Sequence, residues 1–432
     1  MDNAANGELP SHHDGSPSND IQSAGKLPTS VLLKEQPPLL TRLKLYTQVS
    51  LLQSVVTSFF WWKKTFSTSL IKPDLVKAYD TRPHLPVRIF LPPQFDPASG
   101  ATLPLLFTIH GSAFCVGEAR NDDEWNRAFA NATGIMVAAL NYSKAPQHPF
   151  PCALYDLEAV ILEVLADQTL PIRRVSRENT TAAPQRVQLR DHENGPAAAV
   201  SVYGVLDFSR PNRTKALNRH YKNIDGPRGV PTDPLLSIAD IIDWNYVPFG
   251  HDTRDRLVSP FYANLDDLPP FVGFISAELD MYGFDGWSMA CRLREDARKE
   301  TASPETNAAA NVAKLPDPDS DDPLLRVMGR PKASDSSRPL DGTWDWKTRT
   351  GERDERFGWE EDWTTTKGQN RGLKWLLVPD VAHGFDTYIF RESWGHQETI
   401  KDAEWKQGAY IAELGGWLNR TVWALDSSEV LS

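Results

Sequence analysis

Cysteine is scarce in this chain of 432 residues. The three that occur are Cys115, Cys152 and Cys291. An odd number with no closely spaced pair cannot form a complete disulfide framework. The absence of a Cys-x-x-Cys pair also argues against zinc ribbons and dithiol redox centres. We therefore expect the protein to reside in a reducing, intracellular compartment.

Basic charge is also in short supply, because 46 Lys and Arg residues stand against 57 Asp and Glu, which gives a formal net charge of −11. A protein that binds nucleic acid electrostatically needs a basic stripe to neutralise phosphates. The charge balance therefore argues against nucleic acid and favours a small molecule as the partner.

The amino-terminal segment has neither the basic region nor the apolar region of a secretory signal. We accordingly expect an intracellular, cytoplasmic location. Residues 1–38 are rich in Pro, Ser and Gly. This composition is typical of a disordered leader.

Long apolar runs are missing as well, since a membrane-spanning helix needs roughly 18 or more consecutive apolar residues. In segment 39–84, apolar residues recur at helical spacing, at Leu45, Val49, Leu52, Val56 and Phe60. The favoured interpretation of 39–84 is a helical cap segment folded over the body of the protein. The alternative is an interfacial membrane helix over 45–64, because its 61–64 end joins two tryptophans to two lysines.

The remainder, 85–432, alternates short apolar runs with longer helical stretches. The runs expected to be strands are 87–91, 104–109, 135–140, 197–204, 271–277 and 373–379. Helical periodicity is found over 152–167 and 402–419. This alternation predicts an α/β domain with a mostly parallel central sheet flanked by helices. Charged residues, Ser and Pro dominate 297–371, which we expect to be a flexible acidic insertion.

Two motifs follow two of the expected strands. The first, after 104–109, is His110-Gly111-Ser112-Ala113-Phe114. Small residues there allow a tight turn whose backbone N–H groups can stabilise an oxyanion, although an ordinary glycine turn would look the same. The second, after 135–140, runs Tyr-Ser-Lys-Ala-Pro-Gln-His-Pro-Phe-Pro-Cys-Ala over 142–153.

Together the two motifs resemble the hormone-sensitive-lipase-like branch of the α/β-hydrolase superfamily. That family has His-Gly-Gly-Gly-Phe after one strand and Tyr-Arg-Leu-Ala-Pro-Glu-His-Pro-Phe-Pro-Ala-Ala after the next. Ser112 and Ala113 replace two of the glycines here. The second motif matches at Tyr142, Ala145, Pro146, His148, Pro149, Phe150, Pro151 and Ala153, and Asp156 matches the acidic position on the following helix.

The resemblance covers about 85–295 and 372–420 and implies an α/β-hydrolase fold. It implies hydrolysis of a small or medium carboxylic ester through an acyl-enzyme, with no cofactor. The family's acid matches Asp280, and its histidine matches His383, which Gly384 and Phe385 follow. The backbone N–H groups of Gly111, Ser112 and Ala113 would form the oxyanion hole. An Asp after a strand can also be a helix N-cap, so Asp280 has this second interpretation.

The nucleophile of that family is absent. Its serine sits in Gly-x-Ser-x-Gly at a strained strand-to-helix turn. No such motif occurs in the chain, and Ser176, the sole serine between Ser143 and Ser201, lacks small neighbours. The nucleophile is therefore unknown. In the family a strand leads into this turn, and no apolar run corresponds to that strand here. Its loss should leave the strands beside it without backbone partners.

Three explanations of the missing motif stay open. The chain is a pseudoenzyme that binds an acyl ligand or a partner, the product of an altered splice or reading frame over 173–195, or an enzyme with an unrecognised nucleophile.

Metal chemistry finds no support in the sequence. The ten histidines form no His-Glu-x-x-His pattern, and the aspartates of 315–322 lack the spacing of a calcium loop. No metal ion is expected.

Overall fold

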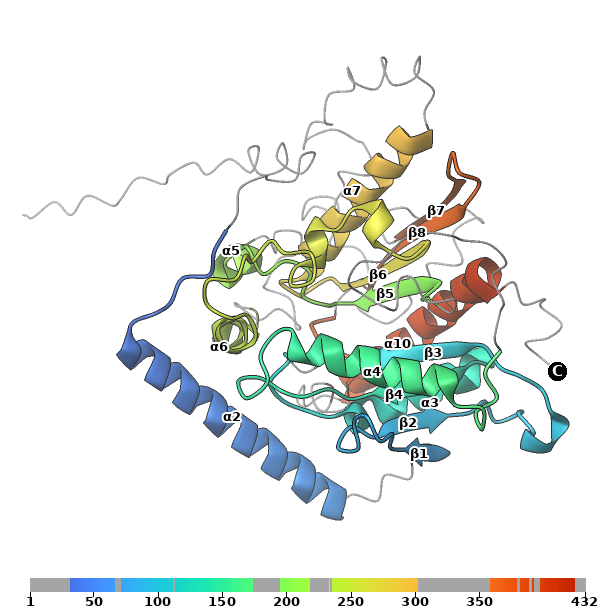
Figure 1. The fold of residues 1–432 in the computed structure, drawn as a ribbon, viewed down its shortest axis with the longest axis horizontal. Helices are drawn as coiled ribbons and strands as arrows, with labels where there is room; N and C mark the ends of the chain where they lie inside the picture. Colours follow the sequence, from blue (N-terminus) through green and yellow to red (C-terminus); the bar gives the residue numbers. More distant parts are fainter. Residues whose placement is uncertain are drawn as a thin grey trace, which may run out of the picture.

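The computed structural model describes residues 32–66, 71–111, 113–173, 195–217, 233, 235–301, 358–378, 381–387, 391 and 397–423 (Figure 1). The strands in these ranges are β1 Leu75–Lys77, β2 Val87–Phe90, β3 Leu105–Ile109, β4 Met136–Leu140, β5 Ala198–Val202, β6 Phe271–Ala277, β7 Gly358–Thr364 and β8 Asn370–Val378. The α-helices are α2 Leu39–Phe66, α3 Asp123–Thr133, α4 Cys152–Ala166, α5 Asn212–Leu217, α6 Leu236–Tyr246, α7 Gly283–Thr301 and α10 Gln397–Leu418.

All six strands expected from the apolar runs are confirmed, as β2, β3, β4, β5, β6 and β8. The sequence did not predict β1 or β7. Strand β1 is only three residues long, and β7 reads Gly-Trp-Glu-Glu-Asp-Trp-Thr, which is too polar to stand out. Both lie at sheet edges, where polar residues are common.

The strands in the described residues form two sheets. Their orders are β1-β2-β4-β3 and β5-β6-β8-β7. The pairs β3–β4, β5–β6 and β6–β8 are parallel, whereas the outer pairs are antiparallel. A shared apolar core holds the halves together: Val137 of β4 and Leu376 of β8 pack into one cluster with Phe129 of α3 and Trp417 of α10. Within the described residues, the expected mostly parallel sheet is thus divided between β3 and β5.

The division runs along the edge of β3 that faces away from β4. Met136 donates its N–H to the carbonyl of Pro104 (3.0 Å), so the backbone groups of Leu103 point away from β4. On that far side Leu103 donates to the carbonyl of Pro171 and accepts from the N–H of Arg173, both at 2.7 Å. A parallel bridge between Leu103 and Ile172 therefore lies just before β3. Farther along β3, Ile109 is 53% exposed.

Three segment boundaries differ from the sequence-based expectation. The 32–38 end of the leader is attached to the body, because Lys34 N–H donates to the carbonyl of His251 (2.9 Å). Residues 75–77 of the expected cap are strand β1. The expected insertion 297–371 is narrower, because its ends belong to α7, β7 and β8. Trp359 of β7 is buried against Arg294 of α7, which explains why the strand is ordered. Residues 1–31 and 302–357 lie outside the described residues.

Helix α2 lies along one edge of the molecule beside α6 (Figure 1). Val49 on its inner face is fully buried with Cys115 and Ala145. The side-chain amide of Gln53 donates to the carbonyls of both residues at 2.9 Å. Among the described helices, none combines the length and apolar character needed to cross a bilayer.

Candidate active site

Asp280 and His383 come together at the carboxyl ends of neighbouring strands. Asp280 follows β6 and His383 follows β8, and these strands run parallel in register from Phe271 opposite Gly372 to Ala277 opposite Val378. His383 Nδ1 lies 2.8 Å from Asp280 Oδ2. The carboxyl side chain is fully buried, while 24% of the imidazole is exposed. The exposed part leaves the imidazole accessible to a ligand.

Backbone contacts hold the two loops in place. Glu278 N–H donates to the carbonyl of Val378 (3.0 Å), and Leu279 N–H donates to that of Val381 (2.9 Å). The N–H of Tyr282 donates to Asp280 Oδ1 at 3.0 Å. Asp280 thus stabilises the turn before α7 and also contacts His383.

The pKa of His383 is raised above its ordinary value. Burial lowers it, but the charge of Asp280 and the hydrogen bond to its carboxylate raise it by more. Because Nδ1 faces an anionic acceptor, the proton of the neutral ring belongs on Nδ1. Nε2 is then available as a base.

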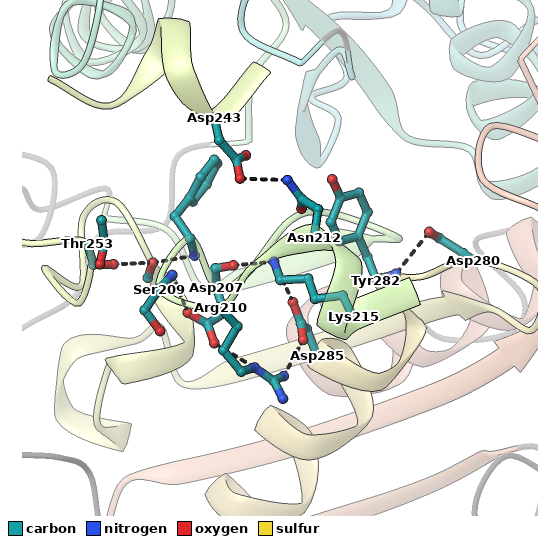
Figure 2. A network of polar contacts seen from close by, with 12 residues as sticks. Asp207, Ser209, Arg210, Asn212, Lys215, Asp243, Thr253, Asp280, Tyr282 and Asp285 are labelled. Carbon is teal, nitrogen blue, oxygen red and sulfur yellow. Dashed lines mark hydrogen bonds and ion pairs between the residues drawn. The ribbon is translucent and has the colours of Figure 1, made fainter. Parts of the chain in front are cut away.

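A buried ionic network lies next to Asp280 (Figure 2). Lys215, whose side chain is 1% exposed, hydrogen-bonds to the carbonyl of Asp207 and lies 3.2 Å from Asp285 Oδ2. Arg210 contacts Asp207 at 3.0 Å and Asp285 at 2.5 Å. The ammonium of Lys215 also lies 5.0 Å from the ring centre of Tyr282. Because the N–H of Tyr282 donates to Asp280, this network supports the loop that carries Asp280.

A second polar network, which no sequence motif indicated, lies behind His383. The hydroxyls of Tyr203 and Tyr410 both donate to the carboxylate of Asp386, and the indole of Trp125 donates to Tyr410. Burial raises the pKa of Asp386, although the two tyrosine hydrogen bonds lower it. The ring of Tyr203 meets that of His383 edge-on, with centres 4.8 Å apart. These contacts fix the face of the imidazole opposite its solvent side.

The loop expected to form the oxyanion hole is described at Gly111 and Ala113, and Ser112 lies outside the described residues. Ala113 and Phe114 have φ of 57° and 58°, in the left-handed region. His110 stacks on Tyr142 with ring centres 4.7 Å apart, and Ala145 N–H donates to the carbonyl of Phe114 (2.9 Å). The two sequence motifs are therefore in direct contact.

The surroundings of His110 suit a structural role rather than that of a catalytic base. Its Nε2 lies 3.0 Å from Asn141 Oδ1. Burial, followed by the charge of Lys144, lowers the pKa of His110 to about 3. Burial also lowers the pKa of Lys144, to about 7. His110 is therefore neutral at physiological pH and orients the loop through hydrogen bonds.

Ala113→Gly should stabilise the protein. A non-glycine residue in the left-handed region costs about 1–2 kcal/mol, and glycine adopts it freely. We expect the free energy of unfolding to rise by about 1 kcal/mol, since glycine also adds entropy to the unfolded chain. Urea unfolding measures the change. Gly100→Ala, at a φ of 70° in a distant turn, should change stability in the opposite direction. A destabilised Ala113→Gly variant would contradict this account of the loop.

Asp156 supports the second motif from α4. Its carboxylate accepts from the N–H of Ser143 at 3.0 Å and from Arg82 Nε at 2.6 Å. Burial raises the pKa of Asp156, but these hydrogen bonds lower it further, so the pKa lies below its ordinary value. The position matched from the family is thus an anchor for the motif.

A nucleophile is missing from the described part of the site. Among the described residues, no serine hydroxyl is hydrogen-bonded to His383. Ser288, in a Gly-x-Ser-x-Ala sequence, lies inside helix α7 and is 8% exposed, so it is not at a strand-to-helix turn. Ser176 lies outside the described residues. The described ranges also contain no cluster of three or more His, Cys, Asp or Glu arranged to hold a metal.

Comparison with known proteins shows what this chain is similar to. A family model described as alpha/beta hydrolase fold matches residues 106–310. An ethyl acetate hydrolase of Pseudomonas putida is 44% identical over 233 residues, which are 49% of this chain and 66% of that protein. An arylesterase of Saccharolobus solfataricus is 26% identical over 222 residues, 49% of this chain and 67% of that protein. An acetyl-hydrolase of Streptomyces hygroscopicus is matched over 56% of its length, at 28% identity. The chain thus spans little more than half of some of these relatives.

Among solved structures, a Pyrobaculum calidifontis esterase superposes with a TM-score of 0.51 at 14% sequence identity. The superposition covers 90% of this chain and all of the esterase. At this level of identity the likeness concerns the fold.

Proposed function

We propose, from the membership of this chain in the hormone-sensitive-lipase-like branch of the α/β-hydrolases, that it binds carboxylic esters and hydrolyses them slowly, without an acyl-enzyme. The observation that carries the proposal is the 2.8 Å contact between His383 and the buried Asp280. The absence of Gly-x-Ser-x-Gly from the sequence is the reason to expect slow turnover.

In the proposed reaction, His383 Nε2 takes a proton from water as the water oxygen attacks the ester carbonyl. The N–H groups of the 111–113 loop stabilise the negative charge that develops on the carbonyl oxygen. Asp280 stabilises the imidazolium, which then gives its proton to the leaving alkoxide as the C–O bond breaks. The products are a carboxylic acid and an alcohol. Hydrolases that have lost a triad member retain roughly 10³–10⁴-fold catalysis over water, which sets the level expected here.

Turnover of nitrophenyl acetate and nitrophenyl butyrate tests the proposal. The wild-type protein should release nitrophenol linearly without a burst, because no acyl-enzyme accumulates. His383→Ala should lose nearly all of this activity, and Asp280→Asn should lose most of it. The matched control is His84→Ala, at an exposed histidine outside the site. Full activity in His383→Ala would refute the assignment.

A second candidate function is binding without catalysis. The observation that favours it is the division of the sheet at β3 and β5, where the family's nucleophile strand is expected. A binding protein of this kind would neither turn over nitrophenyl esters nor react with a serine-directed phosphonate. It would still be stabilised against heat by an acyl ligand.

A further inference from the structure

Gln53, on the inner face of α2, contacts both sequence motifs at once. It lies one turn after Val49, which is fully buried with Cys115 and Ala145. Its side-chain nitrogen donates to the carbonyls of Cys115 and Ala145, each at 2.9 Å. Cys115 comes directly after Phe114, the last residue of the first motif, and Ala145 lies in the second. One amide, 62 and 92 positions away along the chain, therefore joins the two motifs.

Both partners of this amide are acceptors, and both lie away from water. Cys115 is 2% exposed and Ala145 is 0% exposed. A buried carbonyl without a donor is unfavourable, and the amide of glutamine supplies two protons from one nitrogen. A carboxylate of the same shape supplies none. The glutamine at position 53 is thus explained by the loop that it meets, rather than by the apolar face of α2 that it interrupts.

The loop that Gln53 meets is strained. Ala113 and Phe114 have φ values of 57° and 58°, and two successive non-glycine residues in the left-handed region persist only where the surrounding structure holds them. The carbonyl of Phe114 accepts from Ala145 N–H at 2.9 Å, and the carbonyl of Cys115 accepts from Gln53. Because a peptide group is planar, these two hydrogen bonds fix the two successive peptide planes that follow the strained pair.

Helix α2 has further attachments to the body of the protein. Val49 packs on its inner face, and the guanidinium of Arg42 lies 5.6 Å from the ring centre of Phe249. The helix also lies beside α6 (Figure 1). The amide of Gln53 can therefore be removed while α2 stays in place, which separates attachment of the helix from support of the loop.

We propose that Gln53 is a positioning residue, which holds Ala113 and Phe114 in their left-handed conformation so that the backbone N–H groups of this loop can stabilise an oxyanion. Gln53 acts through the loop rather than on the ester. Donors to an oxyanion are most effective when they are in place before the charge develops, so a held loop favours catalysis. This effect on catalysis rests on the ester hydrolysis proposed above, whereas the effect on the loop does not.

Gln53→Met tests the role of the amide, because methionine keeps the length of the side chain and removes both N–H donors. Amide hydrogen exchange over 113–115 should become at least about tenfold faster, since the loop opens more readily. With nitrophenyl acetate, kcat should fall about tenfold to a hundredfold. KM should stay within about twofold of the wild-type value, because the loop stabilises the transition state rather than the bound ester. Gln53→Asn, which keeps the amide but is one methylene shorter, should show the same changes to a smaller extent.

Two control variants lie on the same helix. Gln48→Met makes the same substitution at an exposed position, and Arg42→Met removes a different contact between α2 and the body. Both should leave exchange over 113–115, kcat and KM unchanged. Three results would each overturn the role given to Gln53: unchanged exchange over 113–115 in Gln53→Met, an equal effect of Arg42→Met, or a raised KM at constant kcat. A wild-type protein without turnover would instead refute the proposed function, and the exchange measurement would still decide whether Gln53 holds the loop.

Discussion

Replacing residues 174–194 by a strand–Gly-x-Ser-x-Gly–helix segment should raise the rate of ester hydrolysis by roughly a thousandfold or more. Removing the serine from an intact serine hydrolase costs roughly a millionfold in kcat, so returning one beside an assembled Asp280–His383 pair should recover a substantial part of that factor. The same graft should raise the thermal unfolding midpoint, because its strand would supply backbone partners to β3 and β5.

The geometry at the start of the graft favours this outcome. Pro171 and Arg173 already exchange hydrogen bonds with Leu103 in parallel register, so a strand that continues from Arg173 would run along the edge of β3 that faces away from β4. At its end the serine would leave the sheet on the same side as Asp280 and His383, because parallel strands present their carboxyl ends at one edge. Nitrophenyl ester turnover and reaction with a serine-directed phosphonate measure the gain.

Two controls make the graft decisive. The graft with Ser→Ala should be as stable as the active graft but no faster than the wild type. The graft with His383→Ala should also be slow.

The active graft should gain activity as pH rises through the raised pKa of His383, above the usual histidine value of about 6.5. A graft that becomes more stable while remaining inactive would show that Asp280 and His383 do not form a catalytic pair.

Lys215→Met should lower the free energy of unfolding by about 3–5 kcal/mol. The substitution removes one of the two cations that face Asp285, and breaking a buried ion pair from one side leaves an uncompensated charge. Both side chains are 1% exposed, so water cannot replace the lost ammonium. Burial already raises the pKa of Asp285 despite Lys215 and Arg210. The carbonyl of Asp207 also loses its donor.

Urea unfolding of Lys215→Met and of Lys299→Met tests this prediction. Lys299, at the exposed end of α7, pairs with Glu295 at 3.5 Å, and its loss should cost at most about 0.5 kcal/mol. Adding Asp285→Asn to Lys215→Met should restore part of the stability, because it removes the charge left unpaired. A cost for Lys215→Met as small as that of Lys299→Met would contradict the role given to the network.

Apolar periodicity was sufficient to predict the strands of the core but not their edges. Runs such as 271–277 are continuous and apolar because β6 is covered on both faces. Strand β7 escaped detection because an edge strand needs only alternate residues to be apolar, and only Trp359 is buried. The expected insertion was too wide for the same reason, since polar composition does not separate an edge strand from a loop.

The pairing of Asp280 with His383 follows from motif and chain order, as the resemblance implied, while their catalytic roles stay predictions. The Tyr203–Asp386–Tyr410 network could not be anticipated. Tyr203 and Asp386 are 183 positions apart and belong to no shared motif, so only the folded chain brings them together. The same holds for Lys215, whose burial runs against the usual exposure of lysine.

The divided sheet also has a consequence for how the molecule opens. Continuous sheets transmit cooperativity through their hydrogen bonds, whereas among the described strands β4 and β6 belong to different sheets and meet through the apolar core that also includes α3 and α10. Each half is then a separate unit of local opening, with its own protection against amide exchange. The slowest-exchanging amides should fall in two groups, centred on β4 and on β6–β8. A chain with the central strand would instead exchange as one group.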